Sequence, residues 1–235
     1  MKDDGLHRTL VILSKAPVDG TVKTRLTPAV SASQAARLHC AFLADLAQTV
    51  RQLKDEIGGL RCILAYSGER DHPGFDPFES NLFERWSQGM GDLGQRLSHL
   101  SSRAFNEHAE QVLMIGADSP TLETMHLNNA FEALNRVDVA LGPSFDGGYY
   151  LIGLRKSAPA LFEGIDWSSR FVLEQTVERC RSESLLCELL AFWYDVDTPE
   201  DLERLRFHVL KANPSRSGQK FPATASELKR IFEVI

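Results

Sequence analysis

The sequence predicts an α/β protein in which a mostly parallel sheet lies between two layers of helices. Short apolar runs rich in β-branched residues alternate along the chain with longer segments whose apolar residues recur every three or four positions. Such an alternation favours parallel strands joined by crossover helices. The run Val112–Gly116 is apolar without alternation, as is typical of a strand covered on both faces.

The composition indicates one globular domain. The chain has 235 residues, of which 43% are hydrophobic and 25% charged. A net charge of −6 gives no broad cationic surface, so we expect no nucleic-acid partner. No apolar run is long enough to span a membrane and the first nine residues do not form a signal peptide, so we expect no membrane partner and a cytoplasmic location. A homodimer stays open.

The four cysteines, Cys40, Cys62, Cys180 and Cys187, have no zinc-like spacing and are expected to be free thiols. We expect a domain over residues 1–211. A linker and a C-terminal helix, 212–235, would pack on that domain or on a partner.

Local patterns in the first half of the chain predict three strands and a long helix. The expected strands are Thr9–Leu13, Leu60–Tyr66 and Leu82–Trp86. The helix between the first two begins at Ser31 or Ser33, since either serine can cap it, and ends at Gly58. His39 lies on this helix and is interpreted as having no special role.

A basic loop follows the first strand. It carries Lys15, Lys23 and Arg25 with few acids, and such a set of cations suits a polyphosphate. The loop is not a Walker A loop, because the G-x-x-x-x-G-K-[ST] pattern is absent. The alternative is a solvated surface loop.

A glycine-rich loop follows the third strand. Its glycines, among them Gly91, allow a ligand to approach the backbone closely. The side chains of Gln88, Asp92 and Arg96 could contact a base or a ribose there. A glycine-rich turn is a weak signal on its own, and a helix with an apolar stripe follows it.

Asp118 comes just past the strand that ends at Gly116. Ser119, Pro120 and Thr121 then have the chemistry that starts a helix, which would place the acid between a strand end and a positive helix terminus. Ligands of open α/β sheets bind at that edge. The alternative is that Asp118 only shapes the turn.

A second acid follows the strand expected over Val137–Gly142. Asp146 precedes Gly147 and Gly148, whose backbone N–H groups could approach a ligand while the carboxylate accepts from a hydroxyl or assists a metal. The alternative is an Asp-Gly hairpin turn.

The last third predicts two further helix starts and a strand. Ser168 or Ser169 would cap the helix after Arg170, an arginine that could attract an anion. The end of the apolar run Leu185–Tyr194 is expected to be a strand, which would point Asp195 and Asp197 to the same side. A helix is expected to begin at Thr198, with Thr198 as its cap and Pro199 in its first turn. A linker over Ala212–Lys220 and a final helix over Thr224–Ile235 are expected after it.

The acids and cations together indicate a metal–nucleotide site. Asp118, Asp146 and Asp195 or Asp197 are hard oxygen ligands suited to Mg²⁺ or Mn²⁺. The basic loop would hold the phosphates that such a metal bridges. Carboxylates in one cleft repel one another unless a cation offsets their charge.

Five motifs in this order resemble the DUF2064 family of the nucleotide-diphospho-sugar transferase superfamily. They are Lys15-x-Pro-x-x-Gly-x-Val-Lys-Thr-Arg-Leu26, Gly-Asp-Leu-Gly-x-Arg96, Ile-Gly-Ala-Asp-Ser-Pro120, Asp-Gly-Gly-Tyr-Tyr-Leu-Ile-Gly153 and Asp-Val-Asp-Thr-Pro-Glu-Asp-Leu202. The resemblance spans Thr9 to about Val209. It implies a three-layer, Rossmann-like GT-A fold with a mixed sheet. Within the superfamily the chain is similar to the 2-phospho-lactate guanylyltransferases and, more distantly, to the molybdenum cofactor guanylyltransferases.

The resemblance also implies roles for the motif residues. Asp118 would bind the metal with a second ligand, Asp197 in preference to Asp195. Lys15, Lys23 and Arg25 would hold the nucleotide phosphates, and the glycine-rich loop would lie near the base. Asp146, Gly147 and Gly148 would face the acceptor.

Three functions follow as hypotheses. The first is metal-dependent transfer of a nucleoside monophosphate from a triphosphate to a small phosphorylated or hydroxyl acceptor, with release of pyrophosphate. The second is glycosyl transfer from a nucleotide sugar, with Asp146 as base. The third is a non-catalytic nucleotide-binding protein, since a fold does not fix a function.

Overall fold

The computed structural model describes residues 5–212 and 220–232, and a seven-stranded mixed sheet lies at its centre. The strand order is β3-β2-β1-β4-β6-β5-β7, and β6 alone among these strands runs antiparallel to its neighbours. The mostly parallel, mixed sheet expected from the sequence is therefore confirmed. The strands are β1 (Arg8–Lys15), β2 (Arg61–Ser67), β3 (Phe83–Ser87), β4 (Gln111–Gly116), β5 (Val139–Pro143), β6 (Tyr149–Leu154) and β7 (Cys187–Leu189).

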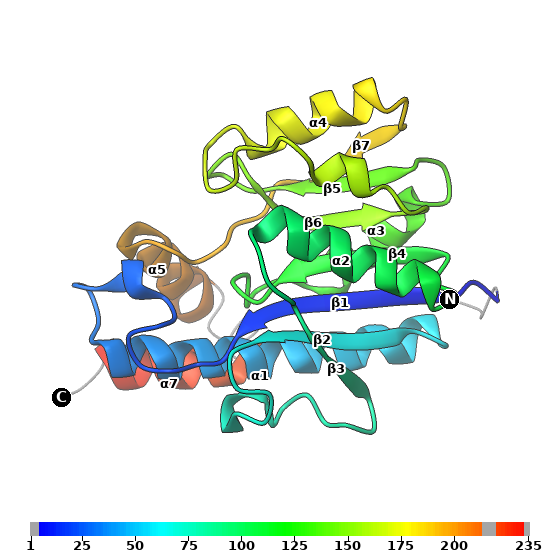
Figure 1. Ribbon diagram of the computed structural model, residues 1–235. Coiled ribbons are helices and arrows are strands. Elements are labelled where there is room, and N and C mark those ends of the chain that lie inside the picture. Colours follow the sequence, from blue (N-terminus) through cyan, green and yellow to red (C-terminus); the bar gives the residue numbers. More distant parts are fainter. Residues whose placement is uncertain (1–4, 213–219, 233–235) are drawn as a thin grey trace.

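Helices cover both faces of the sheet (Figure 1). Side chains alternate along each strand, so Leu10 and Ile12 of β1 pack with α1 and α3, whereas Val11 packs with α2 and α4 on the other face. The helices are α1 (Ala32–Ile57), α2 (Leu93–Asn106), α3 (Thr124–Ala133), α4 (Val172–Ser182), α5 (Pro199–Arg206) and α7 (Pro222–Phe232). Short helical turns are η1 (Thr24–Leu26), η2 (Pro73–Phe75), η3 (Pro159–Phe162) and η4 (Phe207–Ala212), the last of π type.

Two helix starts follow the local signals in the sequence. The cap of α1 is Ser31 rather than Ser33, and its hydroxyl accepts from Gln34 N–H while the Gln34 side chain accepts from Ser31 N–H. At α5, Thr198 and Asp201 form the same reciprocal arrangement, with Pro199 in the first turn. These capping boxes satisfy N–H groups that have no partner inside the helix.

Helix α7 packs along α1, as Figure 1 shows. Its Leu228 joins Leu38 and Phe42 of α1 in a third apolar cluster, which also includes residues of α5. The buried carboxylate of Asp45 accepts from the N–H groups of Ala223 and Thr224 at 3.0 and 2.7 Å. This carboxylate therefore ties the start of α7 to α1.

The start of α7 lies at Pro222, two residues before the expected Thr224. The expected end at Ile235 and most of the expected linker 212–220 lie outside the described residues.

Three expected features are wrong in position. Helix α3 begins at Thr124 and not directly after Asp118, because Thr121 and Leu122 are buried in a turn that precedes it. The N-cap of α4 is Phe171, so neither Ser168 nor Ser169 is the cap, and the Ser169 hydroxyl accepts from Phe171 N–H at 3.2 Å.

The third error concerns the end of the 185–194 run. Strand β7 ends at Leu189, and the segment that follows keeps one isolated parallel bridge, between Ser144 and Trp193, instead of continuing the strand. It crosses the carboxyl ends of β5 and β4: Trp193 N–H donates to Pro143 O, and Val196 N–H donates to Asp118 O. Asp195 is carried over this edge by a crossing segment rather than by a strand.

The four cysteines are free thiols, as expected. In the described part of the chain, no helix combines the length and the apolar character needed to cross a membrane.

Candidate functional site

A cleft of about 800 Å³ opens at the edge of the sheet where the parallel strands end. Loops after β1, β3, β4 and β5 form its walls, together with the segments that precede α4 and α5. Of the residues expected from the sequence, the cleft is lined by Lys15, Lys23, Arg25, Gln88, Gly91, Asp92, Arg96, Asp118, Asp146, Gly148, Asp195 and Asp197, and Gly147 is not among its lining residues. The volume is in the range of small-molecule and cofactor sites.

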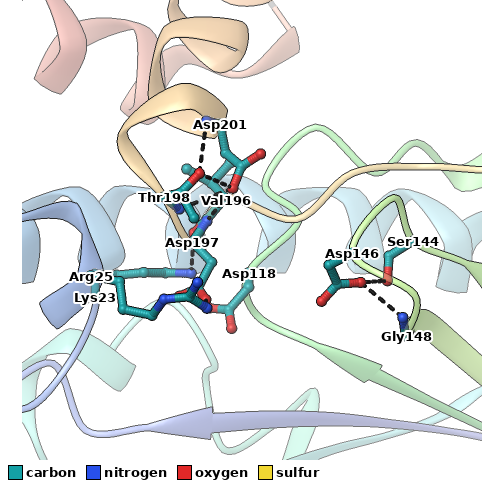
Figure 2. Close-up of polar contacts among 10 residues, drawn as sticks. All are labelled: Lys23, Arg25, Asp118, Ser144, Asp146, Gly148, Val196, Asp197, Thr198 and Asp201. Atoms are coloured by element: carbon teal, nitrogen blue, oxygen red, sulfur yellow. Dashed lines mark hydrogen bonds and ion pairs between the residues drawn. The ribbon is translucent and has the colours of Figure 1, made fainter. Parts of the chain in front are cut away.

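Asp118 and Lys23 form an ion pair in the centre of the cleft (Figure 2). Lys23 Nζ lies 2.5 Å from Asp118 Oδ1 and donates to Val196 O at 2.6 Å. The side chain of Lys23 is 3% exposed, and its backbone is left-handed with φ 52°. Burial opposes the charged form of Asp118, but the nearby cations, Lys23 foremost, hold the pKa of this carboxyl below its usual value. The positive partner of Asp118 is thus an ammonium group and not the helix terminus expected from the sequence.

Arg25 and Asp197 form a second ion pair nearer the surface. Arg25 NH1 lies 2.5 Å from Asp197 Oδ2, and the Arg25 side chain is largely open to solvent whereas the Asp197 side chain is partly exposed. Asp197 directly precedes Thr198, the cap of α5. The basic loop therefore reaches both the acid after β4 and the segment that enters α5.

Asp195 lies close enough to two other acids of the cleft to be affected by their charges. Partial burial and the charges of Asp146 and Asp118 raise the pKa of Asp195 to about 6. Among the described residues, no side chain donates a hydrogen bond to its carboxylate. In the described structure the negative charge of Asp195 therefore lacks a hydrogen-bonded partner, whereas the negative charge of Asp197 is offset by Arg25.

Asp146 shapes the hairpin between β5 and β6 and also lines the cleft. Its Oδ1 accepts from Ser144 Oγ and, at 2.9 Å, from Gly148 N–H. Its Oδ2 has no hydrogen bond among the described residues, and Figure 2 shows the carboxylate on the opposite side of Asp118 from Lys23. Both interpretations left open by the sequence, the turn and the ligand-facing acid, fit this geometry.

Gly147 has a packing role in the hairpin, and the contact with a ligand expected from the sequence stays a prediction. Its φ is 90°, and a Cβ placed there would lie 2.1 Å from Arg170 O. Leu173 N–H also donates to Gly147 O at 2.9 Å. Gly147 thus lets the hairpin approach the start of α4.

The glycine-rich loop forms the wall next to β1 and β2. Gln88 is buried, and its Nε2 donates to Ser14 O and Ala65 O at 3.0 and 2.9 Å. Arg96 donates to Gln88 Oε1 and Gly91 O. The side chain of Asp92 caps α2. The side chains that the sequence suggests for a base or ribose contact are therefore engaged in building the wall itself.

Two groups of lining residues were not assigned to the site from the sequence. His39 is buried, its Nε2 lies 3.1 Å from Ser14 Oγ, and burial lowers its pKa to about 4. A histidine between the buried Leu38 and Phe42 was the available signal. The other group comes from the loop after β4, the hairpin, β6 and the segment before α4, and it comprises Ser119, Ser144, Tyr149, Tyr150, Trp167, Ser168, Ser169 and Arg170.

The acids fit a divalent cation in donor chemistry. Asp118, Asp146 and Asp195 offer hard oxygen donors in one cleft, and burial together with the charges of the other two acids raises the pKa of Asp195. Within residues 5–212 and 220–232, no group of three or more His, Cys, Asp or Glu side chains forms an assembled metal centre.

Comparisons with known proteins agree with this architecture. Residues 49–169 match the model of a family described as uncharacterized protein conserved in bacteria, DUF2064. A solved structure from Desulfovibrio desulfuricans G20, provisionally described as a nucleotide-diphospho-sugar transferase, is 30% identical, with a TM-score of 0.79 over 96% of this chain and 98% of that chain.

More distant proteins share the fold or part of the sequence. The 2-phospho-L-lactate guanylyltransferase of Methanothermobacter thermautotrophicus is 27% identical over 79% of either protein. The 4-diphosphocytidyl-2C-methyl-D-erythritol synthase of Anaerococcus prevotii is 14% identical, with a TM-score of 0.55 over 86% of this chain and 97% of that chain. The expected Rossmann-like α/β fold of nucleotide-diphospho-sugar transferases is confirmed.

Proposed function

The chain belongs to the DUF2064 family, and we propose that it is a metal-dependent nucleotidyltransferase. It would move a nucleoside monophosphate from a nucleoside triphosphate to a small phosphorylated or hydroxyl acceptor. The curated relatives at 22–27% identity carry the name 2-phospho-L-lactate guanylyltransferase, which supports this reaction type.

One observation carries the proposal: a single cleft holds both the cations and the acids that this chemistry needs. Lys15, Lys23 and Arg25 line the same 800 Å³ space as Asp118 and Asp195. Phosphoryl chemistry is catalysed mainly by positioning and by charge stabilisation, so cations next to metal-binding carboxylates are its main requirement.

The basic loop would hold the phosphates. The Lys15 ammonium makes neither a hydrogen bond nor an ion pair within the described ranges, so it is available to a phosphate oxygen. Lys23 uses two of its three N–H bonds, on Asp118 and Val196, and keeps one for a ligand. Arg25 lies at the open end, where its pair with Asp197 can exchange for a phosphate.

Asp118 and Asp195 are the acids that we assign to Mg²⁺ or Mn²⁺. The sequence favoured Asp197 as the second ligand, but the Asp197 carboxylate is paired with Arg25, whereas Asp195 is close enough to Asp118 to be affected by its charge. When bound, the metal would supply Lewis-acid polarisation of the α-phosphate.

In the proposed reaction an acceptor oxygen forms a bond to the α-phosphorus, and the bond from that phosphorus to the bridging oxygen breaks. The electron pair leaves with pyrophosphate. Lys15, Lys23 and Arg25 would offset the negative charge that grows on the leaving group. Asp146, whose Oδ2 lacks a hydrogen bond in the described structure, would orient the acceptor or take the proton of a hydroxyl acceptor.

The test is release of pyrophosphate from each of the four nucleoside triphosphates with Mg²⁺ and a panel of phosphorylated and hydroxyl acceptors. We expect acceptor-dependent release that falls roughly hundredfold or more in Asp118→Asn. Asp76→Asn, an exposed acid outside the cleft, is the matched control and should change nothing. No release with any acceptor, together with turnover of a nucleotide sugar, would reject the proposal.

A thermal-shift screen is the simpler first measurement. A nucleotide at a hundred times its dissociation constant adds about 2.7 kcal/mol of stability. The proposal predicts a shift that needs Mg²⁺ and is lost in Asp118→Asn. A Mg²⁺-independent shift that persists in this variant would contradict the metal assignment.

Glycosyl transfer from a nucleotide sugar is the second candidate. Two observations favour it: the similar structure from Desulfovibrio desulfuricans G20 is described as a nucleotide-diphospho-sugar transferase, and both Lys23 and Arg25 already have carboxylate partners. A diphosphate needs fewer free cations than a triphosphate. Release of nucleoside diphosphate from a nucleotide sugar, without pyrophosphate from triphosphates, would decide for this candidate.

A further inference from the structure

The segment of residues 165–171 forms the cleft wall next to the β5–β6 hairpin. Three of its residues that the proposed nucleotide chemistry does not use, Ser168, Ser169 and Arg170, line the cleft. By sheet order, β4 and β6 separate β5 from β1, which places this wall roughly 10–15 Å from the strand that ends at Lys15.

Close contacts hold this wall in place. A Cβ at Gly94 of α2 would lie 2.4 Å from Trp167 Nε1, and a Cβ at Gly147 would lie 2.1 Å from Arg170 O. Asp166 N–H donates to the Gln175 side chain at 2.7 Å. The segment is therefore fitted against α2, the hairpin and α4 rather than hanging freely over the cleft.

The backbone of the segment is strained where it meets the cleft. Ser168 has φ 71°, a conformation that costs a non-glycine residue energy and persists when the surroundings impose it. This conformation turns the chain between Trp167, which packs against α2, and Arg170, which lines the cleft.

Arg170 differs from the other arginines that line the cleft. Arg25 is paired with Asp197, and Arg96 donates to Gln88 and Gly91. Within the described part of the chain, the Arg170 guanidinium has neither an ion pair nor a hydrogen bond. Its Cζ lies 4.9 Å from the centre of the Phe171 ring. Its five N–H donors are available to a planar or tetrahedral anion.

The acids explain why an acceptor would need this cation. Asp118, Asp146 and Asp195 line the same cleft as the basic loop and Arg170, and by sheet order Asp118, which follows β4, lies between β1 and the β5–β6 hairpin that contacts Arg170. An acceptor with a negative group is repelled by these carboxylates unless a fixed cation holds that group on the side away from the nucleotide. Arg170 is the described cation at that wall.

We propose that Arg170, with the hydroxyls of Ser168 and Ser169, binds an anionic group of the acceptor, a phosphate or a carboxylate. Identifying the bound molecule as the acceptor rests on the proposed function, but the anion site itself does not depend on which group is transferred. Arg170 is a specificity-determining residue: it selects acceptors that carry a negative group at a distance from the attacking oxygen.

The test measures binding of three matched probes, glycerol 3-phosphate, glycerate and glycerol, to protein saturated with Mg²⁺ and its preferred nucleotide. We expect the phosphate probe, the carboxylate probe or both to bind, and glycerol not to bind. In Arg170→Gln the dissociation constant of the bound anion should rise at least tenfold, and Arg170→Lys should recover part of the loss, because lysine keeps the charge without the planar fork.

Two controls isolate the effect. Arg181→Gln removes an exposed arginine of α4, the helix that follows Arg170, outside the cleft, and it should leave anion binding unchanged. Nucleotide binding should stay within twofold of the parent protein in all three variants. In turnover, Arg170→Gln should raise the KM of an anionic acceptor far more than it lowers kcat.

Each result decides the inference. It is overturned if neither anionic probe binds, if Arg170→Gln binds the anion as well as the parent does, or if this variant loses nucleotide affinity to the same extent as anion affinity. Loss of anion binding in Arg170→Gln with no pyrophosphate release from the parent protein supports the anion site and rejects the nucleotidyl transfer. The two ideas can therefore fail separately.

Discussion

Replacing Lys23 by Met would test the ion pair at the centre of the cleft. Methionine keeps an unbranched stem of similar length, so the packing near the Phe42 ring, 5.7 Å from Lys23 Nζ, is largely retained. What the change removes is the ammonium, and with it the contacts to Asp118 Oδ1 at 2.5 Å and Val196 O at 2.6 Å.

The contribution of the Lys23–Asp118 pair to stability follows from the charges of the two side chains and from their exposure to solvent. At an effective dielectric constant of about 20, two unit charges 2.5 Å apart attract by roughly 7 kcal/mol before any desolvation cost. The Lys23 side chain is 3% exposed and has lost most of its hydration, whereas the Asp118 side chain is 50% exposed and is screened by water. The net contribution of the pair should therefore be about 1–2 kcal/mol.

The pH dependence gives this prediction its sign. The pKa of Asp118 lies below its ordinary value of 3.8 in the folded protein. The pair thus stabilises the fold fully above the unfolded-state pKa, and this stability is lost as the pH falls through the folded-state pKa. Lys23→Met should be less stable than the parent at pH 7, and the difference should shrink below about pH 4.

Urea unfolding at a series of pH values between 3 and 7 measures this difference. A double-mutant cycle with Asp118→Asn isolates the pair, because the two single losses should add to more than the loss in the double variant. Equal stability of Lys23→Met and the parent at pH 7, or a loss that does not change with pH, would refute the reasoning.

Three further predictions concern the rest of the cleft. Gly147→Ala should lower the unfolding midpoint by more than Gly20→Ala, since both glycines have a positive φ but only the first would force a Cβ to 2.1 Å from Arg170 O; equal midpoints would contradict the packing role. Asp195→Asn should raise stability by about 1 kcal/mol at pH 8 without metal, because ionising a carboxyl with a pKa of about 6 opposes folding above that pH, and the gain should vanish below pH 4; the measurement is urea unfolding at both pH values. Arg25→Ala should change stability by less than about 1 kcal/mol, as for other exposed pairs, yet weaken nucleotide binding measured by titration calorimetry; unchanged affinity would remove Arg25 from the phosphate site.

Local chemistry made part of this molecule predictable. The start of α1 at Ser31 and of α5 at Thr198 depend on side chains three residues apart, so their capping patterns are visible in the sequence. The mostly parallel sheet followed from the alternation of strand and helix patterns. The prediction that acids following strands line a binding site came from the rule that ligands bind at the carboxyl edge of an open α/β sheet.

Other features depend on contacts between distant residues. Lys23 donates to a carbonyl 173 positions later in the chain, and nothing in the basic loop indicates that partner. Gly147 resembles a ligand-binding glycine in sequence, but the backbone at Arg170 requires it. The end of the 185–194 run has the composition of a strand, yet the strand stops before it and the chain crosses the cleft edge there. His39 lies among apolar residues of α1, and only the fold brings it next to Ser14.

The position of Val196 has a consequence for synthesis on the ribosome. Its N–H donates to Asp118 O and its carbonyl accepts from the Lys23 ammonium, so one late residue joins the loop after β1 to the loop after β4. A nascent chain that ends before Asp195 contains β1 to β7 and helices α1 to α4, but Lys23 has no carbonyl partner and the acidic cluster lacks Asp195. The edge of the cleft is thus completed only after most of the chain has emerged, so an incompletely synthesised protein would have the sheet without the finished cleft.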